Sequence, residues 1–166
     1  MAKAQAVVEE LGRRWLFRER DLELRGISHE WMSFFGPTLG YVRYGRGVWG
    51  HPRYKPTRYD LLAIRFPHAV FWGPSALWLQ GELELEPEAL WIAIDNKARA
   101  PRTLDPTTVV IRARHHKRDS SLFRPPGRAI TLLIHSVERA RADLLARNEA
   151  WRRGGATGFG ALAPCD

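Results

Sequence analysis

Asp95 and Lys97 are the residues whose spacing best fits a catalytic metal site. Asp95 is the last residue of the apolar run 90–95, and Lys97 follows two positions later. Side chains at alternate positions of a strand share one face. A carboxylate and an ammonium group would therefore meet there, as in metal-dependent nucleases, in which the metal activates the attacking water. The upstream acids that could complete such a metal site are Glu82, Glu84 and Glu86. The motif is short, and a solvated strand end explains the same residues.

Histidines and cysteine offer little further chemistry. His115 and His116 are adjacent, so on a strand they would point to opposite faces and could not easily share one metal. We interpret the stretch 115–118 as a basic loop, and His135, in apolar surroundings, as a core residue. The single cysteine, Cys165, excludes cysteine-based zinc sites and an internal disulfide. We therefore expect no metal, no cofactor and no enzymatic step.

A third group of residues is suited to binding phosphate. No acidic residue occurs between Glu30 and Asp60, and all four tyrosines lie in the same stretch. Its basic residues are Arg43, Arg46, Arg53, Lys55 and Arg58. Arginine presents a planar fork of donors that matches phosphate oxygens and guanine edges. A basic, aromatic and acid-free stretch indicates a nucleic-acid surface, although a solvated basic face is the alternative.

The whole chain has the same bias, with a net charge of +8 over 166 residues and 22 arginines against 4 lysines. Its longest apolar run, residues 69–79, is shorter than the ~20 residues that span a bilayer. No signal segment opens the sequence. We expect a soluble, cytoplasmic protein that does not contact membranes.

The first block contains the elements that would position these residues. Periodicity predicts helices over 4–11, 18–25 and 29–35, and then a hairpin over 41–50 whose glycines suit a tight turn. Ser28 is placed to cap the third helix, in which Trp31, Phe34 and Phe35 share a face. This order is that of a winged helix-turn-helix over residues 1–52.

In that arrangement the helix after Ser28 would enter the major groove, the hairpin tip would form the wing, and the basic connector 51–58 would follow the phosphate backbone. The residues predicted to bind DNA are Ser28, His29, Arg43, Tyr44, Arg46, Arg53 and Lys55. A small α+β element that packs against the rest of the chain is the alternative.

The second block, residues 59–153, is predicted to be a mixed α/β domain with a small sheet flanked by helices. Strands are expected over 69–73, 82–86, 90–95, 108–114 and 129–134. Helices are expected over 59–66, 74–82 and 136–153. Residues 154–166 are rich in glycine and alanine and are predicted to form a flexible tail. The expected fold class is thus α+β.

The order of these motifs resembles the AbiEi-type antitoxin and transcriptional-regulator family of abortive-infection systems. The resemblance rests on the basic hairpin over 43–49, the stretch AVFWGPSALWLQG at 69–81, and the closing stretch with Ser136, Glu138, Arg139 and Asp143. It implies a DNA-binding repressor of its own operon. The functional partner it implies is a nucleotidyltransferase-like toxin, which the antitoxin opposes without necessarily touching it.

We therefore expect a protein that binds double-stranded operator DNA, as a monomer or a homodimer, and acts as a type IV antitoxin. The runner-up hypothesis is a metal-dependent nuclease of the PD-(D/E)xK type that uses Asp95 and Lys97. A third hypothesis is an interaction module whose basic face binds an acidic protein.

Overall fold

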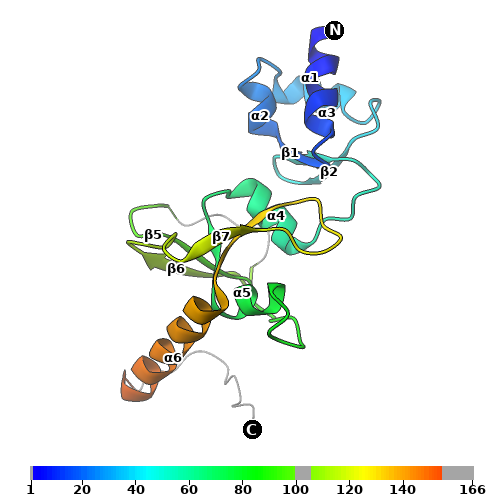
Figure 1. The fold of residues 1–166 in the computed structure, drawn as a ribbon. Coiled ribbons are helices and arrows are strands. Elements are labelled where there is room, and N and C mark those ends of the chain that lie inside the picture. Colours follow the sequence, from blue (N-terminus) through cyan, green and yellow to red (C-terminus); the bar gives the residue numbers. More distant parts are fainter. Residues whose placement is uncertain (1, 100–105, 155–166) are drawn as a thin grey trace.

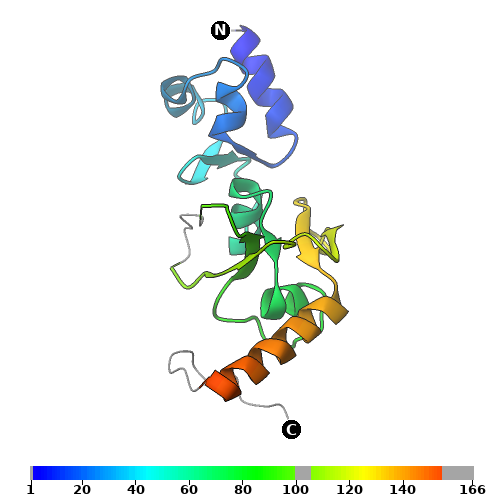
Figure 2. The same ribbon diagram turned by 90° about the vertical axis from the view of Figure 1, so that its left-hand side faces the viewer.

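The structure is a computed structural model that describes residues 2–99 and 106–154, with side chains up to residue 148. The described residues form six helices and two sheets, of three and five strands, so the mixed α and β composition is confirmed. The elements gather into an N-terminal lobe and a second lobe, from which the last helix projects (Figures 1 and 2). Apart from residue 154, the predicted tail lies outside the described residues.

The N-terminal lobe consists of three helices and a small antiparallel sheet (Figure 1). In chain order its elements are α1 (Ala2–Gly12), β1 (Leu16–Arg18), α2 (Glu19–Glu23), α3 (His29–Phe35), β2 (Val42–Gly45) and β3 (Val48–Gly50). The strand order is β1-β3-β2, so β3 is central and pairs with both neighbours.

Local sequence explains the turns of this lobe. Gly26, between α2 and α3, has φ +80°, and Gly47, in the turn of the hairpin, has φ +72°, which is a region that favours glycine. Ser28 caps α3, because its hydroxyl accepts a hydrogen bond from the Trp31 backbone amide at 3.2 Å. The predicted cap and hairpin are therefore confirmed.

Two expectations for this lobe were wrong. The helix predicted over 18–25 is only Glu19–Glu23, because Arg18 belongs to β1 and residues 24–26 form a turn. In α3 the buried residue is Met32, whereas Phe34 of the predicted aromatic face is 75% exposed.

The second lobe has a mixed five-stranded sheet of order β6-β5-β4-β8-β7, in which β5–β6 and β4–β8 are parallel pairs. Its strands are β4 (Val70–Phe71), β5 (Trp91–Asp95), β6 (Val109–Ala113), β7 (Ser120–Phe123) and β8 (Leu132–His135). Its helices are α4 (Arg58–Arg65), α5 (Gly73–Leu79) and α6 (Val137–Gly154). Helix α4 packs on one sheet face, through Tyr59 and Leu62, and α6 reaches the other, through Leu144.

The strand predicted over 82–86 is wrong, and β7 was not predicted. Residues 82–86 form no strand: Leu85 is 82% exposed, and the flanking acids Glu82 and Glu86 pair with Arg141 and Arg58. Alternation of apolar and polar residues does not by itself produce a strand when no neighbouring strand is present to form backbone hydrogen bonds with it. Strand β8 begins at Leu132, three residues later than expected.

The two lobes share a hydrophobic cluster. Leu16 of β1 and Val48 of β3 belong to the same group of buried side chains as Tyr59 and Leu62 of α4. The hydroxyl of Tyr44 strengthens this junction, because it lies 2.9 Å from the carbonyl oxygen of His51 in the connector. Each lobe therefore contributes to the burial of the other. Among the described residues, no helix is long and apolar enough to cross a membrane.

The buried His135 should make stability depend on pH. Burial first, and then the charge of Arg139, lowers the pKa of His135 below its ordinary value of 6.5, against opposing effects of the His116 carbonyl, Asp143 and Asp119. Below pH 6.5 the unfolded chain therefore binds this proton more readily than the folded chain, so stability falls as the pH falls. Urea unfolding from pH 7.5 to 5.5 should show this slope.

Two histidine variants of this lobe test the prediction, one at the buried position and one as the control. His135→Gln should flatten the dependence of the urea midpoint on pH, whereas His68→Gln, at an exposed turn position, should leave it unchanged. Equal slopes in the wild type and both variants would contradict this assignment.

Candidate nucleic-acid interface

The start of α3 is held in place by Glu19, the first residue of α2. The Oε1 atom of Glu19 lies 2.6 Å from Nδ1 of His29 and accepts a hydrogen bond from Nε1 of Trp49 at 3.2 Å. The backbone amide of Glu19 donates to the carbonyl of Gly47 at 3.0 Å. This carboxylate therefore links α2, α3 and the hairpin, with only 12% of its side chain exposed.

The predicted residues Ser28 and His29 thus have structural partners as well as solvent exposure. Because a carboxylate only accepts, Nδ1 of His29 donates to Glu19, which leaves Nε2 as the second polar atom of a ring that is 45% exposed. The next residue is acidic: the backbone amide at Glu30, and then the Ser28 hydroxyl, lower the pKa of the Glu30 carboxyl. Helix α3 contains no lysine or arginine, so lysine or arginine contacts with phosphate have to come from residues outside it, such as those of the hairpin and connector.

Arg43 on β2 is partly neutralised within the fold. Its guanidinium carbon lies 6.0 Å from the ring centre of Trp49, its cross-strand partner, and its Nη2 is 3.9 Å from Oε2 of Glu19. A phosphate would have to compete with this weak ion pair. Arg43 is therefore suited to a supporting contact.

Arg46, in the turn between β2 and β3, is the exposed basic side chain at the tip of the hairpin. Within the described ranges it has no ion-pair partner. Its charge reaches Arg65, the last residue of α4, because burial first, and then the Arg46 charge, lowers the pKa of Arg65. Nη1 of Arg65 is buried with no hydrogen-bond partner among the described residues. Two cations that interact electrostatically and have no ion-pair partner among the described residues favour the approach of an anion.

The other predicted contacts lie on the connector side. The Tyr44 hydroxyl is used inside the fold, beside the carbonyls of His51 and Tyr54, and burial raises the pKa of this phenol. Arg53 and Lys55 are exposed. The structure therefore gives Tyr44 a role in fixing the hairpin to the connector, while the two basic side chains remain free to follow a phosphate backbone.

The alternative nuclease site lacks the arrangement that its chemistry needs. Lys97 lies in the turn after β5, where its backbone amide donates to Oδ1 of Asp95 at 2.8 Å. Only Asp95 belongs to the strand, so the two side chains do not share one strand face as predicted. The nearest titratable contact of Asp95 is Nδ1 of His116, at 4.0 Å. Among the described residues, no three His, Cys, Asp or Glu side chains are grouped to hold a metal.

Removing the Glu19 carboxylate should destabilise the N-terminal lobe. Glu19→Ala leaves the indole N–H of Trp49, a residue that is 3% exposed, without its acceptor, and an unsatisfied buried donor costs about 1–3 kcal/mol. Urea unfolding followed by tryptophan fluorescence would measure this loss. Glu23→Ala, at an exposed position of the same helix, removes the same charge and should change stability little. If the two variants are equally stable, Glu19 does not hold the lobe together.

Glu19 and Arg65 were not predicted to belong to this surface. Both roles depend on contacts with residues distant in sequence, and neither residue lies in a motif that would mark it. No protein-family model matches the sequence, and no curated protein matches it significantly. The function is therefore inferred from the residues and their geometry.

Proposed function

We propose that the N-terminal lobe is a winged helix-turn-helix that binds double-stranded DNA. The observation that carries this proposal is the order α1-β1-α2-α3-β2-β3 with a β1-β3-β2 sheet. At the tip of the β2–β3 hairpin lies Arg46, an exposed arginine with no ion-pair partner among the described residues. Helix α3 is then the helix that enters the major groove, and the hairpin is the wing that contacts a phosphate or the minor groove.

The exposed side chains of α3 suit contacts with base edges. In a neutral His29 ring whose Nδ1 donates to Glu19, Nε2 is an acceptor, which matches the exocyclic amine of adenine or cytosine. Ser28 can donate or accept. Phe34 is 75% exposed, and an aromatic ring can contact the methyl group of thymine. The wing would supply affinity, and these residues would supply sequence preference.

The more specific form of the proposal is a transcriptional repressor that acts as an AbiEi-like type IV antitoxin and needs no enzymatic step of its own. It is supported by the resemblance of the motifs at 43–49, 69–81 and 136–145. This form requires a gene for a nucleotidyltransferase-like toxin beside its own and repression of their shared promoter. A promoter fusion that the protein does not repress would contradict it.

Binding to duplex DNA that contains the promoter tests the broader proposal. We expect a footprint, and an observed binding constant that falls steeply as the salt concentration rises, because phosphate contacts release counterions. Incubating the same DNA with Mg²⁺ separates the nuclease hypothesis, which predicts cleavage that Asp95→Ala abolishes. If no duplex is bound at low salt, the interaction-module hypothesis replaces this proposal.

A further inference from the structure

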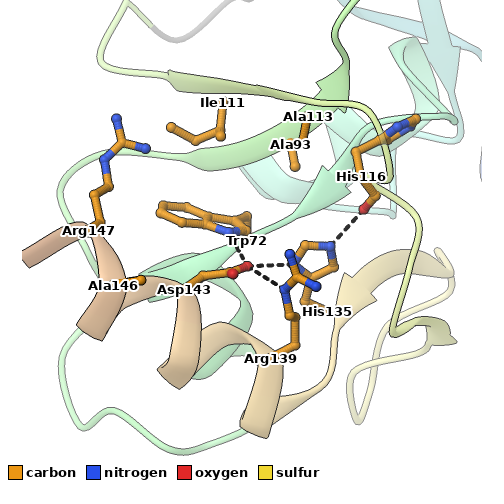
Figure 3. Close-up of a pocket in the computed structure, with 10 residues that line it drawn as sticks. All are labelled: Trp72, Ala93, Ile111, Ala113, His116, His135, Arg139, Asp143, Ala146 and Arg147. Carbon is orange, nitrogen blue, oxygen red and sulfur yellow. Dashed lines mark hydrogen bonds and ion pairs between the residues drawn. The ribbon is translucent and has the colours of Figure 1, made fainter. Parts of the chain in front are cut away.

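The second lobe contains a cavity between the five-stranded sheet and α6 (Figure 3). Its volume is about 320 Å³, which falls in the range of about 300–1,000 Å³ that is usual for small-molecule sites. The residues that line it come from β5, β6 and β8, from the position between β4 and α5, from the loop after β6, and from α6. None of them belongs to the proposed DNA-binding surface.

Small side chains keep this space open. Ala93 on β5, Ala113 on β6 and Ala146 on α6 line it with methyl groups only, which leave room that longer side chains would fill. Trp72 and Ile111 supply the larger apolar surfaces, and the indole of Trp72 lies in the centre of the group (Figure 3). The walls therefore suit a flat apolar ring that contacts Ile111 and the accessible part of the indole, since Trp72 is 4% exposed.

One end of the cavity carries an unsatisfied acceptor. Nε2 of His135 lies 2.7 Å from the carbonyl oxygen of His116 and must donate to it, because a carbonyl only accepts. In the neutral ring Nδ1 is then an acceptor. This atom is buried and has no hydrogen-bond partner within the described part of the chain, and the side chain as a whole is only 3% exposed.

Asp143 places a second acceptor beside it. Its Oδ2 accepts from Nε1 of Trp72 and from Nε of Arg139, each at 2.8 Å, so the carboxylate is fixed in place (Figure 3). The same oxygen lies 3.8 Å from Nδ1 of His135. Two adjacent acceptors with no donor between them favour a ligand that brings an N–H or O–H group.

The other end of the cavity carries a cation. The guanidinium carbon of Arg147 lies 5.5 Å from the ring centre of Trp72, and the side chain has no acidic partner among those described. Arg147 follows Asp143 by four positions on α6, which corresponds to about 6 Å along the helix axis. A ligand that reached both ends would therefore carry its donor and its anion on opposite sides of one ring.

We propose that this cavity binds a small aromatic acid with a hydrogen-bond donor across the ring from its carboxylate. The ring lies against Trp72, the donor bonds to Nδ1 of His135 and to Asp143, and the carboxylate pairs with Arg147. The site is independent of the DNA-binding surface, so it can be tested whether or not the protein binds DNA.

Calorimetric titration of the full chain with 4-aminobenzoate tests the proposal, with aniline and benzoate as probes that each lack one group. We expect 4-aminobenzoate to bind about tenfold or more tightly than either, because each missing group removes a hydrogen bond or charged contact. Arg147→Ala should weaken 4-aminobenzoate to the level of aniline and leave aniline unchanged. Arg141→Ala, which removes an exposed arginine of α6 that does not line the cavity, should change neither.

Two further measurements do not depend on the arginine. The ¹⁵N resonance of His135 Nδ1 should shift when 4-aminobenzoate binds, since this nitrogen gains a donor. Ala146→Leu, at an exposed helical position, should keep the fold and abolish binding by filling the cavity. The proposal is overturned if 4-aminobenzoate does not bind at millimolar concentration, if it binds no better than both probes, or if Arg147→Ala and Arg141→Ala behave alike.

Discussion

Replacing Arg46 with alanine should lower the affinity for promoter DNA at least about tenfold, because a hydrogen bond to a charged group contributes about 1.5–3 kcal/mol. The salt dependence should change as well. Loss of one phosphate contact reduces the slope of log K against log salt by about 0.9. Arg46 is exposed in the hairpin turn and has no ion-pair partner among the described residues, so its charge is available to a phosphate.

Comparison with Arg43 makes this prediction specific. Arg43 already lies near Trp49 and 3.9 Å from a Glu19 oxygen, so Arg43→Ala should cost less affinity than Arg46→Ala. Arg141→Ala, on α6 of the other lobe, is the control for the loss of one positive charge. Filter binding or fluorescence anisotropy at several salt concentrations would measure all three variants. An Arg46→Ala variant with the salt slope of the wild type would exclude this side chain as a phosphate contact.

Elements that the sequence predicted well are those specified by neighbouring residues. The Ser28 cap acts over three positions, from its hydroxyl to the Trp31 amide, and the hairpin depends on glycine in its own turn. Strand β5 is a continuous apolar run. In each case the determining interactions are close in the chain, so a pattern in one short stretch contains the necessary information.

Elements that depend on distant partners were missed. Strand β1 exists because Phe17 pairs with Trp49 on β3, and nothing within residues 16–18 reveals that partner. Residues 82–86 show the opposite error, an alternating pattern with no strand beside it.

The candidate site follows the same rule. Its basic residues could be predicted from charge and spacing, because exposed arginines need no partner in the fold. The role of Glu19 could not be predicted, because it depends on contacts with His29 and Trp49, which lie on other elements of the fold. Tyr44 was assigned to DNA by composition, whereas its hydroxyl lies against the connector carbonyls.

Truncating Leu62 should produce the largest loss of stability among these changes. Leu62 is 5% exposed and belongs to the cluster that joins Leu16 and Val48 of the N-terminal lobe to the sheet of the second lobe. Leu→Ala substitutions at buried sites cost about 2–5 kcal/mol, through lost transfer free energy and the cavity left behind. Leu85→Ala, at a position that is 82% exposed, should cost little. Chemical denaturation followed by circular dichroism would compare the two variants.

The same variant tests whether the lobes are one cooperative unit. Because Val48 packs in the cluster that contains Leu62, a cavity in α4 should also weaken hydrogen-exchange protection at the amides of β3, in the other lobe. If Leu62→Ala lowers protection in β4, β5 and β8 but leaves β3 unchanged, the lobes are stable independently. If protection falls in both, the β2–β3 hairpin of the N-terminal lobe depends on the second lobe for its position. Mutations in the second lobe could then weaken the proposed DNA binding, although the mutated residues lie outside the proposed interface.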